Sequence, residues 1–227
     1  MNTNTEVFGG SPIALADERQ RVLRNTYALL AVSMIPTVLG AWVGVSTGIT
    51  SLMSPMVGLV VFLAGAFGFM FAIQKYRNSG LGVALLLGFT FFMGLMLARL
   101  LGIVLSKGNG ASLVMMAFAG TGAAFFGMAI LSSVIKRDLG NFSRFLFIGA
   151  IGILAVGIAN VFIQSGALMM TLSVLAILVF SAFILVDLKR VRDGEETNYI
   201  TATLGVYLSL YNVFQSLLMM FGILGDD

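Results

Sequence analysis

The sequence predicts an all-α fold, a polytopic membrane bundle with seven transmembrane helices. Of the 227 residues, 59% are hydrophobic and 10% are charged, and the mean hydropathy is +1.01. Soluble domains carry about 25% charged residues, so this composition is typical of a membrane protein. The apolar residues also form seven runs, each close to the roughly 20 residues that a helix needs to cross a bilayer core.

The seven predicted spans follow one another with short connections, which leaves no room for a large soluble module. They cover residues 27–45, 56–73, 81–105, 113–135, 145–163, 168–186 and 199–224. Residues 1–26 precede them as a polar segment, in which residues 17–24 have the pattern of a short amphipathic helix. We therefore divide the chain into a polar cytoplasmic N-terminal tail, residues 1–26, and a seven-helix transmembrane domain, residues 27–225.

Lysine and arginine are distributed unevenly between the two sides of the predicted bundle. The side of the N-terminus holds eleven of the 13: Arg19, Arg21, Arg24, Lys75, Arg77, Lys136, Arg137, Arg144, Lys189, Arg190 and Arg192. The other side holds Arg99 and Lys107. Because cytoplasmic loops carry an excess of Lys and Arg, the N-terminus is predicted to be cytoplasmic. Seven crossings then put the C-terminus on the outer side. A six-span alternative would put it inside, but the continuous apolar run after Tyr199 argues against that alternative.

Small residues recur at intervals of four in the first and fifth predicted spans. They are Gly40, Gly44 and Gly48 in the first and Ala155 and Ala159 in the fifth. Small residues at this spacing let helix backbones approach closely. The pattern therefore predicts close helix packing rather than a binding site.

Arg99 in the third span follows an uncharged stretch, residues 80–98. We expect it near the outer interface, where its long stem can extend so that the guanidinium reaches water. Asp187 stands at the inner end of the sixth span. A direct Arg99–Asp187 pair would have to cross most of the membrane and is therefore rejected.

Asp187 is an acidic residue at the end of an apolar run, residues 166–186. The other acids between residues 27 and 224 are predicted to lie in loops: Asp138, Asp193, Glu195 and Glu196. A charge at the centre of a membrane helix costs roughly 2.5–3.5 kcal/mol, and less toward an end, so an acid there is by default a functional candidate. Its Cβ vector tilts toward the helix N-terminus, which aims the carboxylate into the bilayer. The alternative is a helix-end residue satisfied by Lys189, Arg190 or water.

The seventh predicted span carries polar residues along one side. Ser209, Asn212 and Ser216 form one stripe at helical spacing, and Tyr207, Tyr211 and Gln215 form a neighbouring stripe. Such residues have two interpretations. They make interhelical hydrogen bonds, worth about 0.6 kcal/mol each, or they line a wetted path that faces Asp187. We expect Asp187 to lie close to the Ser209–Asn212 face. Asp187, Ser209 and Asn212 are thus the candidate pore or proton site.

The composition excludes several function classes. The chain has no cysteine and no histidine, which excludes disulfides, Cys-ligated metals, a Ser-His-Asp triad and an HExxH site. No phosphate-binding GxxxxGK[ST] loop is present, and a two-aspartate intramembrane protease would need a second membrane acid. The net charge of +3 comes from basic residues that flank apolar runs, so it reports topology rather than nucleic-acid binding. We expect no enzyme activity, no cofactor and no nucleic-acid partner.

Several motifs in order resemble the Bax inhibitor-1 family, also called the transmembrane Bax inhibitor motif family. They are Phe89-Thr-Phe-Phe-Met-Gly-Leu95, Ala117-Phe-Ala-Gly-Thr121-Gly, Lys136-Arg-Asp138-Leu-Gly-Asn-Phe-Ser143-Arg-Phe-Leu146, Phe183-Ile-Leu-Val-Asp187 and Tyr207-Leu-Ser-Leu-Tyr-Asn212-Val-Phe. The resemblance covers roughly residues 19–225 and is strongest to the bacterial YccA-type branch. It implies an integral protein of the bacterial inner membrane with a periplasmic C-terminus.

The resemblance implies two different functions. Family members are described as pH-sensitive calcium leak channels, in which two aspartates of the last two spans share a proton. Asp187 matches the first aspartate, whereas Ser209 stands at the second position, so the chain departs from that pattern. The YccA-type branch is instead associated with the membrane AAA protease FtsH, as its substrate and modulator. This protease would engage residues 1–26, which we expect to be poorly packed. We take the modulator function as the first hypothesis and the cation leak as the alternative.

Overall fold

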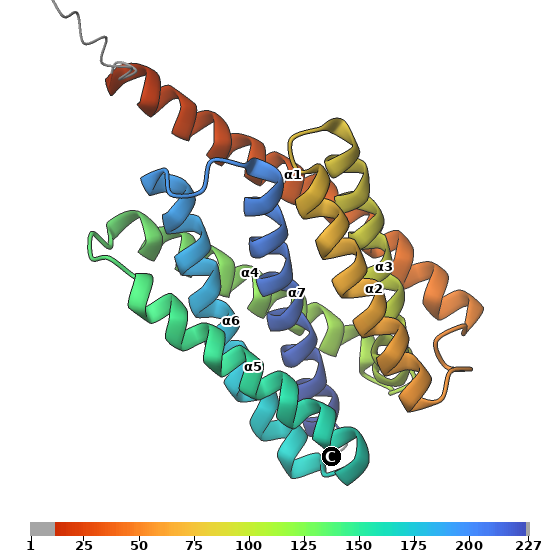
Figure 1. The fold of residues 1–227 in the computed structure, drawn as a ribbon. Helices are drawn as coiled ribbons and strands as arrows, with labels where there is room; N and C mark the ends of the chain where they lie inside the picture. The colour runs from red at the N-terminus through yellow and green to blue at the C-terminus, as the bar shows by residue number, and fades with distance from the viewer. Residues whose placement is uncertain (1–11, 226–227) are drawn as a thin grey trace, which may run out of the picture.

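A computed structural model describes residues 12–225, and within them the chain folds into a bundle of seven α-helices (Figure 1). They are α1 (Pro12–Thr47), α2 (Pro55–Tyr76), α3 (Gly80–Leu105), α4 (Gly110–Val134), α5 (Gly140–Ile163), α6 (Gly166–Asp193) and α7 (Tyr199–Leu224). Each is long and apolar enough to cross a membrane. The predicted all-α, seven-span fold is therefore confirmed, and the chain is an integral membrane protein.

Side-chain caps mark where several of these helices begin. Ser54 and Ser165 accept hydrogen bonds from the backbone N–H groups at the starts of α2 and α6, and Asn198 does so for α7. These caps satisfy N–H groups that have no partner inside the helix. At its other end, α6 stops at Gly194, whose φ of +81° is a left-handed conformation that glycine adopts readily.

The closest helix packing joins α1 to α3. A β-carbon on Gly40 would clash with the backbone of Phe91, and one on Gly94 would clash with the backbone of Thr37. One turn further along α1, a β-carbon on Gly44 would clash with Ala98. The predicted role of Gly40 and Gly44 in close packing is thus confirmed, with Gly94 as the matching glycine of α3.

Two other small-residue predictions are wrong. Gly48 lies in the turn after α1 with φ +66° and open space around it, so it serves the turn and not the helix contact. Ala155 and Ala159 are exposed on α5. Among the described helices, α5 contacts chiefly α6. The spacing of Ala155 and Ala159 therefore does not mark a contact with another helix of the described chain.

Hydrogen bonds between connections define the two ends of the bundle. At one end, Asn198 donates to the carbonyl of Arg77, so the α6–α7 connection meets the α2–α3 connection. At the other end, Arg99 donates to the carbonyl of Met53 and Lys107 to that of Gly222. We call the first the basic end, because eleven of the 13 Lys and Arg residues belong to its segments. Arg99 lies near the opposite end, as predicted.

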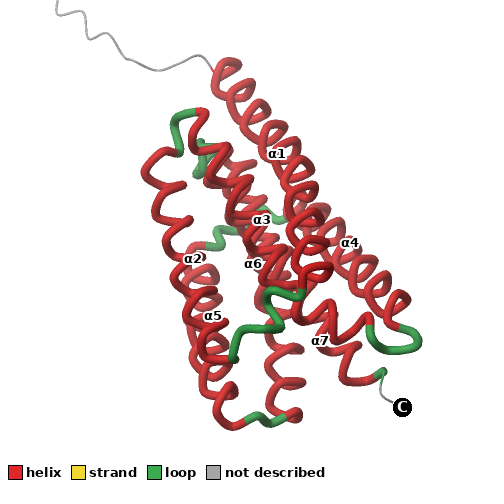
Figure 2. Tube along the Cα trace, turned by 90° about the vertical axis from the view of Figure 1, so that its right-hand side faces the viewer, coloured by secondary structure: helices red, strands yellow, loops and turns green. Residues whose placement is uncertain are grey.

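The second half of the predicted N-terminal tail is helical, and part of it is packed against the bundle. Residues 12–26 continue the first span as one helix, whose N-terminal end extends beyond the neighbouring helices (Figures 1 and 2). Val22 is buried in a small cluster with Val191 and Ala202, and Thr26 is fully buried. The expectation that residues 1–26 are poorly packed is therefore wrong for residues 22–26. Residues 1–11 lie outside the described part of the chain.

Candidate site at the α6–α7 hairpin

Asp187 lies on the face of α6 that packs against α7. The two helices form an antiparallel hairpin joined by residues 194–198, and their contact is among the most extensive in the bundle. A β-carbon on Gly205 would lie 3.1 Å from Oδ2 of Asp187 and 3.4 Å from its Cγ. Gly205 therefore makes room for the carboxyl group between the two helices. The sequence analysis missed Gly205, although it stands one turn before Ser209 on the same face.

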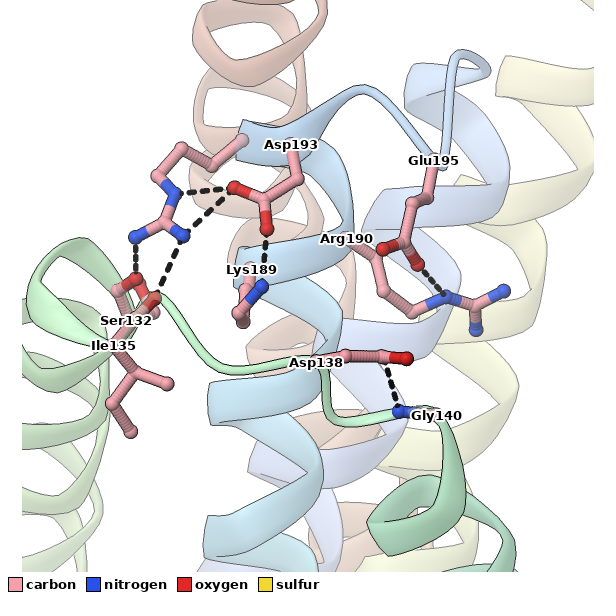
Figure 3. A network of polar contacts seen from close by, with 9 residues as sticks. Ser132, Ile135, Asp138, Gly140, Lys189, Arg190, Asp193 and Glu195 are labelled. Atoms are coloured by element: carbon pink, nitrogen blue, oxygen red, sulfur yellow. Dashed lines mark hydrogen bonds and ion pairs between the residues drawn. The ribbon is translucent and has the colours of Figure 1, made fainter.

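The basic residues that follow Asp187 do not pair with it. Lys189 pairs with Asp193, and Arg192 also binds Asp193 through Nη2 at 2.7 Å (Figure 3). Arg190 and Glu195 are 3.7 Å apart. Asp187 makes no hydrogen bond or ion pair with any residue of the range 12–225. Lys189 and Arg190 therefore do not bond directly to Asp187, although the charge of Arg190 acts on its carboxyl group.

Asp193 has a different place from the one predicted. It is the last residue of α6 rather than a loop residue, and its carboxylate joins Lys189 and Arg192 of the same helix. The helix continues past the apolar run because these i,i+4 and adjacent pairs satisfy the charges of its last turns.

Arg192 links α6 to the end of α4. Its guanidinium donates to the carbonyl oxygens of Ser132 and Ile135, the latter at 3.0 Å (Figure 3). The last carbonyls of a helix have no partner inside that helix, and a cation near them is also favoured by the helix dipole. The side chain therefore caps α4 and fixes the basic end of the hairpin.

Ser209 and Asn212 lie further along α7 than Gly205, toward the opposite end of the bundle. Ser209 is buried and Asn212 is half-buried. Asn212 donates to the carbonyl of Leu208 in its own helix, and Ser209 makes no hydrogen bond within the described chain. Asp187 thus lies beside α7 at a point one turn from Ser209, and no direct bond joins the three candidate residues.

Two tyrosines of α7 make interhelical hydrogen bonds, in addition to the bond that Thr203 donates to the carbonyl of Thr26 on α1. The hydroxyl of Tyr207 lies 2.9 Å from that of Thr37 on α1 and 3.4 Å from the carbonyl oxygen of Thr90 on α3. Tyr211 donates to the carbonyl of Met93 at 3.2 Å. Both side chains are buried. The polar stripe that joins helices is therefore the tyrosine stripe, whereas Asn212 of the neighbouring stripe bonds within its own helix.

Comparison with known proteins gives a family match over most of the chain. The sequence profile of the family described as "Inhibitor of apoptosis-promoting Bax1" matches residues 19–226. The chain belongs to the Bax inhibitor-1 family. It is 36% identical over 207 residues to a protein of Escherichia coli strain K12 named "Modulator of FtsH protease YccA", which covers 91% of this chain and 92% of the relative. The predicted resemblance to the YccA-type branch is thereby confirmed.

Other bacterial members of the Bax inhibitor-1 family are similar over the same length. A membrane protein of Vibrio cholerae is 35% identical over 210 residues, which is 92% of each chain. A protein of Pseudomonas aeruginosa is 36% identical over 216 residues, which is 94% of this chain and 95% of the relative. The homologue in another Escherichia coli strain is named "Inner membrane protein YccA". None of these four relatives carries the name of an enzyme.

Proposed function

We propose that this protein is an inner-membrane modulator of an FtsH-type AAA protease and acts in membrane-protein quality control. The observation that carries the proposal is the 36% identity, over nine-tenths of the chain, to a protein named as a modulator of that protease. The termini are proposed to lie as the charge bias predicts, with the N-terminus in the cytoplasm and the C-terminus in the periplasm. Reporter fusions at both ends check this topology, and a C-terminal reporter active only in the cytoplasm would refute it.

The N-terminal part of α1 supports a physical route for contact with the protease. Ala16, Asp17, Glu18 and Gln20 are exposed on the part of α1 that extends past the bundle. Residues 1–11 precede this part, so a processive protease at the membrane surface would meet a polar segment before any packed helix. The N-terminal segment is thus the proposed handle, that is, the segment that the protease binds first. The protease would then have to pull the helical bundle out of the membrane.

Reconstitution of the full chain with an FtsH-type protease in liposomes tests the proposal. We expect the chain to slow degradation of a second membrane substrate, and deletion of residues 2–15 to lengthen the lifetime of the chain itself. A control chain carries an unrelated polar sequence of equal length at residues 2–15 and should be degraded like the original. If the chain neither changes substrate turnover nor is isolated with the protease, the modulator function is wrong.

A cation leak along the α6–α7 hairpin is the second candidate function. The observation in its favour is a membrane carboxyl group, Asp187, that lies between two helices and makes no hydrogen bond or ion pair with residues 12–225. Oxygen donors suit calcium, but the described residues hold no group of three or more acids that would form a dedicated metal site. A transient cation contact at Asp187 is therefore proposed rather than a resident ion.

Flux of calcium into liposomes that contain the purified chain separates the two candidates. A leak predicts flux that Asp187→Asn reduces and that Asp138→Asn, the same change in an exposed turn, leaves unchanged. A modulator without conductance predicts no flux in any variant. Flux that is insensitive to Asp187→Asn would remove the main support for the leak.

A further inference from the structure

A cavity of about 240 Å³ opens between the start of α5 and the end of α6, at the basic end of the bundle. Its polar lining includes Ser143 and Arg144 from α5 and Lys189 and Arg190 from α6. Leu139 and Val186 supply apolar wall. This volume is below the range of about 300–1,000 Å³ for sites that hold a whole drug-sized molecule. It suits a compact polar group.

The charges around the cavity leave a net positive site. Asp138 and Glu195 also line it, but Oδ1 of Asp138 accepts from the N–H of Gly140, and Glu195 faces Arg190 at 3.7 Å (Figure 3). Lys189 is paired with Asp193. Arg144 is exposed and makes no hydrogen bond or ion pair with residues 12–225. Its guanidinium is therefore the charge available to a ligand.

The connection before α5 adds two more cations. Lys136 and Arg137 are exposed on the α4–α5 connection and likewise have no acidic partner within the described chain. With Arg144 they form a group of three such cations within nine residues of sequence. A second surface cavity at the basic end, about 370 Å³, has Arg77 as its sole basic lining residue. The α5–α6 cavity is thus the better anion site of the two.

An apolar surface continues from this cavity toward the middle of the bundle. Phe147 and Ile148 lie one turn after Ser143 and Arg144 on the same face of α5, and both are more than 60% exposed. Leu178 of α6 is also 64% exposed. The cavity therefore lies where a polar, positively charged surface gives way to the hydrocarbon-facing surface of two helices. This is the height of lipid headgroups.

We propose that the α5–α6 cavity binds the phosphate-bearing headgroup of an anionic phospholipid, whose acyl chains lie against Phe147 and Ile148. Basic pockets between membrane helices on the cytoplasmic side bind such headgroups. An excess of basic residues alone reflects only topology. Here the charge lines a cavity of headgroup size next to exposed apolar side chains of α5, which a free anion would not use.

Native mass spectrometry of the purified full chain tests the site with phosphatidylglycerol and phosphatidylcholine as probes. We expect phosphatidylglycerol to bind more tightly, and Arg144→Gln to weaken it about fivefold, since one basic group near an anionic lipid is worth about 1 kcal/mol. Arg144→Lys should retain most of the preference. Arg77→Gln, an equal charge change beside the other cavity, should weaken binding less than twofold.

Each other outcome of this experiment overturns the assignment. Equal binding of the two lipids would mean that the cavity does not recognise an anionic headgroup. Equal losses in Arg144→Gln and Arg77→Gln would mean that only the general surface charge acts. Full competition by millimolar glycerol 3-phosphate would make the ligand a free phosphate rather than a lipid. Because Arg144 is exposed, its substitution should leave the fold intact, and a thermal unfolding profile like that of the original chain checks this. If the unfolding profile of Arg144→Gln is altered, Arg144→Lys becomes the deciding variant. A loss of phosphatidylglycerol preference in Arg144→Lys would then refute the site.

Discussion

Oδ2 of Asp187 on α6 lies 3.1 Å from the position that a β-carbon on Gly205 of α7 would occupy. This distance is shorter than an ordinary van der Waals contact, so the carboxyl group and the bare backbone of Gly205 fit together as one unit. The absence of a side chain at residue 205 is what lets an ionisable group stay between two packed helices. A substitution at either residue should therefore alter the effect on stability of a substitution at the other.

We predict that Gly205→Ala and Asp187→Ala are energetically coupled. Alanine in a helix is favoured over glycine by about 1 kcal/mol, but at residue 205 the new methyl would press on the carboxyl group and offset that gain. In the Asp187→Ala background the gain should appear in full. The measurement is a double-mutant cycle on thermal unfolding in detergent, with an expected coupling of about 0.5–1 kcal/mol.

Gly127→Ala on α4 is the matched control for this cycle, because open space surrounds Gly127. It should have the same effect in both backgrounds. Strict additivity of Gly205→Ala and Asp187→Ala would contradict the contact.

We predict that Gly94→Ala is strongly destabilising. The added methyl would overlap the backbone of Thr37, and backbone cannot move aside as the end of a flexible side chain can. Overpacking of this kind costs about 1–3 kcal/mol or more. Gly68→Ala on α2, where nothing lies nearby, should not destabilise and should gain up to about 1 kcal/mol from helix propensity. Thermal unfolding of the two variants makes the comparison, and similar midpoints would mean that α1 and α3 can separate without cost.

Hydropathy predicted the existence of every helix but not how far each extends. A run of about 20 apolar residues is required by the bilayer, so the seven spans were visible in the sequence. The helices α1 and α6 continue beyond their apolar runs to Pro12 and Asp193. The α6 extension depends on polar contacts, such as the pairs of Asp193, that hydropathy does not register, and its length was therefore missed. The helical start of α1 was predicted in part, from the amphipathic pattern of residues 17–24.

The candidate site was predicted in part for a similar reason. The direction of a helical side chain follows from backbone geometry, so the sequence places Asp187 toward the bundle. The contact residue on α7 depends on the length of the connection between the helices, and the structure brings Gly205, one turn before Ser209, against the carboxyl group. Ala155 and Ala159 illustrate the same limit, since spacing alone does not tell whether a neighbouring helix is present.

We predict that Arg192→Gln loosens the end of α4. The guanidinium donates to two carbonyls of that end, and a hydrogen bond that involves a charged group is worth about 1.5–3 kcal/mol. Hydrogen exchange should become faster in residues 132–139 and remain unchanged in α3. Arg137→Gln removes an exposed cation from the adjacent connection and serves as the control. Equal exchange in the two variants would argue that Arg192 does not hold α4.

We predict that Val22→Asp detaches the N-terminal part of α1 from the hairpin. Val22 is buried against Val191 and Ala202, and an unpaired charge in that cluster costs free energy that the detached state avoids. A cost of about 1.4 kcal/mol or more raises the detached population at least tenfold. Because cleavage of a transiently opened segment follows that population, trypsin should cut after Arg24 about tenfold faster.

Gln20→Asp introduces the same charge at an exposed position of the same helix and should leave the trypsin rate unchanged. If residues 1–26 are the handle for the protease, Val22→Asp should also shorten the lifetime of the chain when an FtsH-type protease is active, because the segment that the protease grips no longer has to be pulled off the hairpin. Faster trypsin cleavage together with an unchanged lifetime would place the handle elsewhere. Equal trypsin rates in Val22→Asp and Gln20→Asp would instead mean that the contact among Val22, Val191 and Ala202 does not hold the start of α1 in place.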